Sequence, residues 1–270
     1  MSKAFKIIGG SFFLLGVILL SVNIYGLFQN IRPETFPNQD LRFSNDTPIP
    51  YKTALEEIQK KESESENEYL DRLSRVIAKS IAHIDWNQLE SSAYNMHVPV
   101  WENYILFGMG LFSGIPEFEK YHFASHLRSL KRGVGVCGDA SMVMSQILDI
   151  HGIPNQMLTF PGHVVVAVQN EQDEKVFDPD FGVALPFAPE DLKYHPQAVG
   201  NIYMNAGYTE NDARIINSIY EENFTRWNGV KHFITKRYYF EKIAYALKWL
   251  IPFLSIGFGI ILSRNKFTKI

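Results

Sequence analysis

The sequence predicts an α+β protein in which a helix packs on an antiparallel sheet, with a membrane-spanning helix on either side of this core. Three observations lead to this prediction. A long apolar run lies near each end of the chain, at residues 7–28 and 243–263. A helical pattern over 137–150 precedes three short runs that are rich in β-branched and aromatic residues. The 270 residues are enough for one domain besides the two apolar runs.

Composition excludes several classes of protein. Hydrophobic residues make up 46% and charged residues 20% of the chain, which is typical of a folded protein rather than a disordered one. The net charge of -3 argues against a nucleic-acid partner. The single cysteine excludes an internal disulfide and leaves one free thiol, whose role has to be explained.

The first apolar run carries no charged residue over 7–28, which is enough to cross a hydrocarbon core of ~30 Å. A cleavable signal peptide is the alternative interpretation. The run is too long for the apolar part of a signal peptide, and no cleavage site with the small-x-small pattern follows it. We therefore predict an uncleaved membrane anchor over residues 1–30.

The second apolar run contains Lys248 near its start and Pro252 inside it. The Lys248 ammonium can reach the membrane interface, where Tyr245 and Trp249 are typical belt residues. An amphipathic or buried C-terminal helix is the alternative. We predict a second membrane-spanning helix and a basic tail over residues 243–270.

Basic residues at the chain ends predict the orientation. They precede the first run and follow the second, at Lys3, Lys6, Arg264, Lys266 and Lys269. Positively charged flanks favour the cytoplasmic side, so residues 31–242 are expected on the periplasmic or extracellular side. Three basic residues lie on the other side of the second run and weaken this inference, namely Lys236, Arg237 and Lys242.

Residues 31–66 are polar and rich in proline, which is typical of a tether. We expect this tether to turn helical near Thr53. Residues 67–242 form the predicted soluble domain, and apolar residues at helical spacing predict that it begins with an amphipathic helix over 67–85.

The rest of the soluble domain mixes helices and strands. Residues 98–112 are apolar and fit either a strand or a helix, whereas 118–132 and 209–222 are predicted helices. The central helix begins near Cys137 and is expected to stop at Gly152 and Pro154. The three predicted strands that follow it are "NQMLTF" at 155–160, "HVVVAVQN" at 163–170 and "KVFDPDFG" at 175–182.

Cys137 lies where a helix begins, and a helix N-terminus favours the thiolate form of cysteine. A thiolate nucleophile also needs a histidine, and the histidine needs an acceptor that orients it. His163 opens the middle strand and Asp178 closes the next one. Neighbouring antiparallel strands place such positions close together, so the three side chains can converge. The alternatives are a buried core cysteine and an Asp178 that, like Asp180, merely serves a turn.

Three segments together resemble the transglutaminase-like superfamily, within the papain-like cysteine fold. They read "GVCGDASMVMSQILDIHGIP", "PGHVVVAV" and "VFDPDFG", and they fall within residues 133–183. The resemblance implies that Cys137 is the nucleophile, His163 the base and acid, and Asp178 the group that orients the histidine. It also implies an oxyanion-hole side chain upstream, for which Trp101 and Asn103 are candidates.

The resulting hypothesis is a membrane-anchored cysteine protease, amidase or acyltransferase that acts through a thioester. Its expected partner is a peptide or protein substrate in the cell envelope or outside the cell, and no cofactor is expected. A metal site is not predicted either, because Phe123 follows His122 of the His122–His126 pair where a metalloprotease helix has Glu. The alternative is an inactive binding or scaffold module in envelope or polysaccharide assembly.

Overall fold

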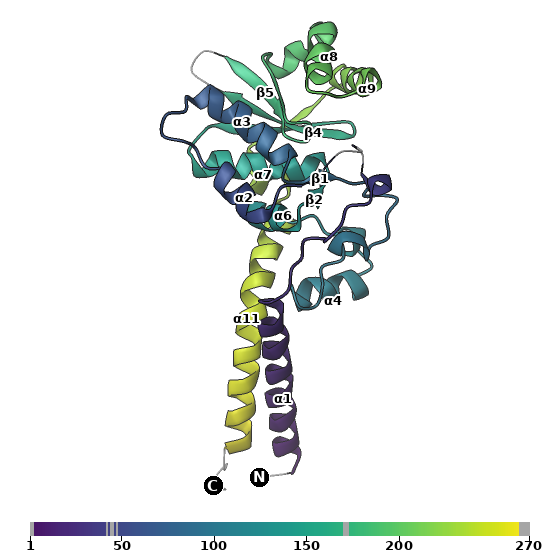
Figure 1. The fold of residues 1–270 in the computed structure, drawn as a ribbon. Coiled ribbons are helices and arrows are strands. Elements are labelled where there is room, and N and C mark those ends of the chain that lie inside the picture. The colour runs from purple at the N-terminus through teal and green to yellow at the C-terminus, as the bar shows by residue number, and fades with distance from the viewer. Residues whose placement is uncertain (1–2, 42, 44–45, 47, 170–172, 265–270) are drawn as a thin grey trace. The chain divides into compact units, whose positions relative to one another are not determined.

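A computed structural model describes residues 3–41, 43, 46, 48–169 and 173–264 (Figure 1). These residues form two compact units. The helical unit contains residues 3–31, 91–121 and 239–264, and the sheet unit contains the described residues of 32–90 and 122–238. The basic residues Lys266 and Lys269, on which the predicted orientation partly depends, lie outside the described residues.

The sheet unit is built on a five-stranded antiparallel sheet with the strand order β6-β5-β4-β3-β7. Its strands are β3 (Asn155–Phe160), β4 (His163–Gln169), β5 (Glu174–Asp178), β6 (Val183–Leu185) and β7 (Thr225–Trp227). The first two predicted strands are confirmed as β3 and β4. The third is β5, which ends at Asp178 as the site argument expects, and the rest of the predicted run, up to Gly182 at φ +69°, forms the turn to β6.

Helices cover both faces of this sheet (Figure 1). One face packs against α3 (Glu66–Ala78) and α7 (Cys137–Ile150), and the other packs against α8 (Pro196–Asn205) and α9 (Glu210–Tyr220). The remaining elements are α2 (Tyr51–Glu57), α6 (His126–Arg132), α10 (Gly229–Phe233), two short 3₁₀ helices (Asn38–Asp40 and Pro189–Tyr194) and the parallel pair β1 (Ala82–His83) and β2 (Val134–Gly135).

The alternation of side chains along β4 explains the two cores. Val166 and Val168 point into the core with α3 and α7, whereas Val165 and Ala167 point into the core with α8 and α9. His163 has the same parity as Val165, so it faces the side of α8 and α9. On β5, Val176 belongs to that same core, and Asp178 follows it two residues later on the same face.

Two predicted helices differ from the observed ones. The helix expected over 67–85 ends at Ala78, because residues 82–83 leave it and pair with β2. The helix expected over 118–132 is interrupted between α5 (Pro116–Glu119) and α6, where the chain passes from one unit to the other. The expected tether does contain a helix near Thr53, and Ala54 and Ile58 from this segment are buried in the core with α3 and α7.

The helical unit consists mainly of α1 (Lys3–Gly26) and of residues 239–264 of α11 (Thr235–Arg264), and these two helices run antiparallel and side by side (Figure 1). The other elements of this unit are α4 (Tyr104–Phe112), α5 and a 3₁₀ turn (Ala93–Asn95). The buried residues of α1 are Gly9, Gly16, Asn23 and Gly26. The first three are seven residues apart and form one stripe that faces α11.

Glycine is required along this stripe because the two backbones touch. A Cβ on Gly16 would lie 2.7 Å from the carbonyl oxygen of Pro252, and one on Gly259 would lie 2.6 Å from the amide nitrogen of Phe13. Close approach of small residues is the common way in which helices pair in a bilayer. The stripe therefore explains how two apolar helices associate while most of their surface stays exposed.

Pro252 creates a polar requirement within α11. Proline has no N–H, so the carbonyl of Lys248, four residues earlier, lacks its helical donor. The side-chain amide of Asn23 donates to this oxygen at 2.6 Å, and the hydroxyl of Tyr104 donates to it at 3.1 Å. The helix partner and the α4 segment thus satisfy the acceptor that Pro252 leaves open.

By length and composition, α1 and α11 are each able to cross a membrane. In the most apolar window of each helix, 17% of the residues are buried. A helix in the core of a soluble protein would be mostly buried, so the alternative of a buried C-terminal helix does not fit α11.

Candidate active site

The thiol of Cys137 lies at the first residue of α7, as the sequence predicts. Val136 precedes it in an extended conformation, and its N–H donates to the carboxylate of Asp139 at 3.0 Å, which fixes the start of the helix. Cys137 is partly exposed, whereas most of the helix behind it is buried. The thiol is therefore accessible from one side.

His163 and Asp178 form a buried pair. The Nε2 atom of His163 donates to Oδ2 of Asp178 at 2.7 Å, and the exposed fractions of the two residues are 2% and 0%. Cys137 makes a side-chain hydrogen bond with the same imidazole. Because Asp178 occupies Nε2, Nδ1 is the ring nitrogen that remains for the thiol. The three residues that the sequence singled out are thus brought together.

The environment of His163 favours its protonated form. Burial by itself lowers the pKa of this imidazole, but the charge and hydrogen bond of Asp178 raise it, and Cys137 adds to the increase. The net result is a pKa well above the usual value of His. An imidazolium next to the sulfur is the arrangement that stabilises a thiolate.

Asp178 is held by more partners than the sequence indicates. Its Oδ1 accepts the backbone N–H groups of Asp180 and Phe181 at 3.1 and 3.3 Å, and its Oδ2 also accepts the hydroxyl of Tyr203 at 2.8 Å. The hydroxyls of Tyr203 and Tyr220 lie 2.8 Å apart. Burial and the nearby charge of Asp178 raise the pKa of both tyrosines, so their hydroxyls stay protonated and able to donate.

The neighbouring aspartate belongs to a different pair. Both carboxylate oxygens of Asp180 lie 2.8 Å from Nδ1 of His83, on the short strand β1. Asp180 lies in the turn after β5, as expected, and its carboxylate is buried and paired with His83. Of the two aspartates, Asp178 is the one in contact with His163.

A third histidine–aspartate pair lies at the start of α7. Nδ1 of His122 lies 2.8 Å from the fully buried carboxylate of Asp139, and the ring of His122 stacks on Trp86 with a centroid distance of 4.1 Å. Burial opposes ionisation of Asp139, but His122 and then Arg132 outweigh it and lower the pKa of this carboxyl. Arg132 is fully buried and lies over the Trp86 ring.

A cavity of about 550 Å³ opens beside the thiol. We call it the cysteine cavity, and its lining residues are Gln39, Leu41, His83, Ile84, Asp85, Trp86, Asn87, His122, Val136, Cys137 and Gly162. Two of these residues are the histidines that pair with Asp180 and Asp139. The cavity is mostly polar with one aromatic wall, which suits a polar chain such as a peptide.

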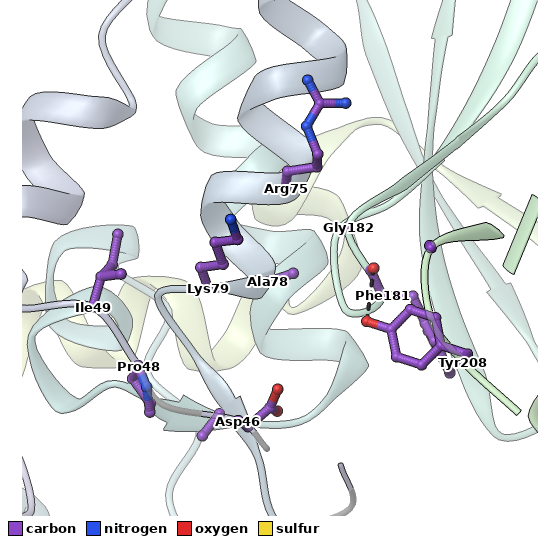
Figure 2. Close-up of a pocket in the computed structure, with 11 residues that line it drawn as sticks. Asp46, Pro48, Ile49, Arg75, Ala78, Lys79, Phe181, Gly182 and Tyr208 are labelled. Carbon is purple, nitrogen blue, oxygen red and sulfur yellow. Dashed lines mark hydrogen bonds between the residues drawn. The ribbon is translucent and has the colours of Figure 1, made fainter. Parts of the chain in front are cut away.

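A second cavity of about 520 Å³ borders β1 at Ala82, and Figure 2 shows its lining. Arg75 on α3 and Lys79 just after its end line this cavity, and the hydroxyl of Tyr208 donates to the carbonyl of Phe181 at 2.8 Å (Figure 2). Burial raises the pKa of Asp46 in this cavity to about 6. Cys137 does not line it.

Other candidates from the sequence have structural roles or different partners. The side-chain oxygen of Asn103 accepts the N–H groups of Ile105 and Leu106 and caps α4, and both Asn103 and Trp101 belong to the helical unit. His126 lies 3.2 Å from the side-chain oxygen of Gln146, so it does not form a pair with His122. In the described part of the chain, no group of three His, Cys, Asp or Glu residues is placed to hold a metal ion.

Sequence reasoning missed Tyr203, Tyr220 and Trp86. Each reaches the site only through the packing of its own element, and the sequence around it contains no motif that points to Cys137. Comparison with protein-family models, with curated proteins and with solved structures finds no match to this chain.

Proposed function

We propose that this protein is a membrane-anchored, transglutaminase-like cysteine enzyme that acts on amide bonds through a thioester. The observation that supports this most is the buried imidazole of His163, which contacts Asp178 through Nε2 and Cys137 through its other edge. A core cysteine would have no need of a charged, oriented histidine. The resemblance of residues 133–183 to that superfamily points to the same chemistry.

The proposed reaction has two steps. The thiolate of Cys137 attacks the carbonyl carbon of an amide, and the N–H groups at the start of α7 stabilise the negative oxygen. The C–N bond then breaks, and His163 gives its proton to the leaving amine nitrogen. Water or a second amine next attacks the thioester and loses a proton to His163, which releases an acid or a new amide and restores the thiolate.

The proposed substrate is a peptide or protein outside the cytoplasm. The polar cysteine cavity would receive its chain next to Cys137. The apolar helices α1 and α11 would anchor the enzyme in the cell membrane with both chain ends in the cytoplasm. Hydrolysis and acyl transfer share the first step and differ only in the group that attacks the thioester.

Alkylation of the single cysteine tests the proposal. An ordinary thiol with a pKa near ~8.5 is almost fully protonated at pH 6, whereas a thiolate paired with an imidazolium is reactive there. In the full chain in detergent micelles, iodoacetamide at pH 6 should modify Cys137 roughly tenfold faster, or more, than it modifies a free thiol. His163→Ala should move the reactivity to alkaline pH. A thiol that reacts only after denaturation would contradict the enzyme and favour a binding module.

A matched pair of aspartate variants tests the assignment of Asp178. We expect Asp178→Asn to lower the rate at which p-nitrophenyl acetate acylates Cys137 by about 10²-fold or more, given the ~10⁴-fold loss for the corresponding change in a serine-protease triad. Asp180→Asn removes an equally buried carboxylate that serves His83 instead. It should leave that rate nearly unchanged, and the opposite ranking of the two variants would refute the assignment.

A further inference from the structure

Helix α4 is apolar on nearly its whole circumference. Its sequence is "YILFGMGLF", and Leu106 is its buried residue. At its C-terminal end, Leu111 is 53% and Phe112 is 85% exposed, and Ile115 just beyond it is also exposed. No charged residue occurs between Glu102 and Glu117. Exposure of such an apolar surface to water is unfavourable, so we expect another apolar surface or a membrane to cover it.

Hydrogen bonds fix the start of α4 against α11. The Tyr104 hydroxyl donates to the Lys248 carbonyl at 3.1 Å, and the Lys248 ammonium donates to the backbone carbonyl of Glu102. The hydroxyl of Tyr245 donates to the carboxylate of Glu102 at 2.6 Å. The amide of Asn23, from α1, donates to the same Lys248 carbonyl. The first turn of α4 therefore lies level with Asn23 and Lys248.

This level corresponds to one end of the apolar helix pair. Lys248 is five residues inside the apolar run that starts at Ile243, which is roughly 8 Å along a helix that rises 1.5 Å per residue. The first residues of α1 and the last residues of α11 are at the opposite end of the pair (Figure 1). The depth of the first turn of α4 thus matches the 5–10 Å to which interfacial helices enter a bilayer.

We propose that α4 is a third membrane contact, which lies in the interface of the leaflet remote from the chain termini and inserts Leu111 and Phe112 among the lipids. The partner is lipid rather than another protein, because hydrogen bonds hold the first turn of α4 beside α1 and α11 at the level of Lys248, inside the apolar run of α11. This inference rests on the two spans of the proposed function but not on the chemistry of Cys137. It makes residues 100–115 part of the membrane anchor.

Lipid quenching of single labels tests this contact. In the full chain with Cys137→Ala, Phe112→Cys is labelled with an environment-sensitive fluorophore and placed in vesicles of phosphatidylcholine and phosphatidylglycerol. Leu111→Cys is a second labelling position, in case Phe112→Cys does not fold. We expect quenching by nitroxide-labelled lipids, blue-shifted emission, and loss of quenching by aqueous iodide.

Two labels serve as matched controls. Phe253→Cys is an exposed position on α11 and should behave like Phe112→Cys, and Tyr194→Cys is an exposed aromatic position in the sheet unit and should be quenched by iodide alone. Iodide quenching at 112 together with lipid quenching at 253 would overturn the α4 contact and keep the span. Shielding of 112 from both quenchers would indicate a covering protein and also overturn it. Iodide quenching at 253 would refute the span itself.

Discussion

The carboxylate of Asp178 accepts hydrogen bonds on both of its oxygens. One oxygen binds the N–H groups of Asp180 and Phe181 and so forms the turn that ends β5, while the other binds His163 and Tyr203. The same side chain therefore ends the strand and orients the histidine. A substitution here alters both local structure and chemistry, so a residue behind Asp178 is a cleaner probe of orientation.

Tyr203 is that probe. We expect Tyr203→Phe to keep the fold, because it removes only the hydroxyl, and to lower the free energy of unfolding by about 1.5–3 kcal/mol, the usual range for a hydrogen bond to a charged group. The acylation rate of Cys137 by p-nitrophenyl acetate should fall by about tenfold, since 1.4 kcal/mol of lost orientation corresponds to that factor. Chemical denaturation and the acylation assay measure the two effects.

Tyr208→Phe is the control for Tyr203→Phe. The Tyr208 hydroxyl is also inside the sheet unit but donates to the carbonyl of Phe181 rather than to Asp178. It should reduce stability without the tenfold loss of acylation. Equal losses of acylation in the two variants would mean that Tyr203 acts only through stability.

The sequence predicts the three central residues of the candidate site, but it does not predict the side chains that support them. Cys137, His163 and Asp178 each sit at the end of an element with a clear sequence pattern, so their convergence follows from one helix and two paired strands. Tyr203 and Tyr220 come from α8 and α9, which are separated from those strands along the chain and reach Asp178 only through tertiary packing. No periodicity in the sequence indicates that contact.

Among the elements, strand β4 and helix α7 closely match their predicted bounds. The reason is that β4 is a run of β-branched residues and that α7 has apolar residues at helical spacing. Helix α3 does not, because Ile81 and Ile84 continue its apolar period but are buried beyond the end of the helix, on either side of β1. The helical spacing of Ile81 and Ile84 predicts a helix, but the residues between them form a strand that pairs with β2. The sequence therefore predicts the type of an element correctly only where the spacing of its buried residues matches the backbone hydrogen bonds that it forms.

The pairing of α1 with α11 gives a prediction at the level of the element. Asn23→Leu removes one of the side-chain donors to the carbonyl of Lys248. It should lower the free energy of unfolding in micelles by about 1 kcal/mol, within the range for hydrogen bonds between helices in membranes. In a Pro252→Ala background, the restored N–H of residue 252 can donate to that carbonyl. The cost of Asn23→Leu should then nearly vanish, as a double-mutant cycle would show.

Ser21→Leu is the reference for that cycle. Ser21 lies two residues earlier on an exposed position of α1, and its hydroxyl bonds only within the helix, to the carbonyl of Val17. It should cost little in either background. The same loss for Asn23→Leu with and without Pro252 would mean that the Asn23 amide does not serve the carbonyl.

At the scale of the molecule, sequence patterns located the two apolar helices but not the composition of the two units. Residues 91–121 join α1 and α11, although they lie far from both in the chain, and residues 32–66 belong with the sheet. The contacts between these segments include single polar ones, such as Lys248 with the carbonyl of Glu102, which a hydropathy profile does not register. A hydropathy profile thus locates the two apolar helices but does not show which other residues pack against them.

The proposed arrangement with two membrane spans predicts where each end of the chain lies. A phosphatase reporter that is active only outside the cytoplasm should be active when fused after residue 238, which precedes the apolar part of α11. The same reporter fused after residue 270 should be inactive, because the positively charged chain ends favour the cytoplasm. Activity at both positions would mean that α11 does not cross the membrane.

The carbonyl of Lys248 is bound by donors from other segments instead of a helical N–H. This has a consequence for the order in which the segments of the chain are synthesised. A chain leaves the ribosome from its N-terminus, so α1 and Tyr104 are complete before α11 is synthesised. Both donors to that carbonyl, Asn23 and Tyr104, are therefore already present when the helix with Pro252 is synthesised. A rearranged gene that encodes α11 first would release the same helix with its backbone acceptor unsatisfied, and should yield less inserted protein.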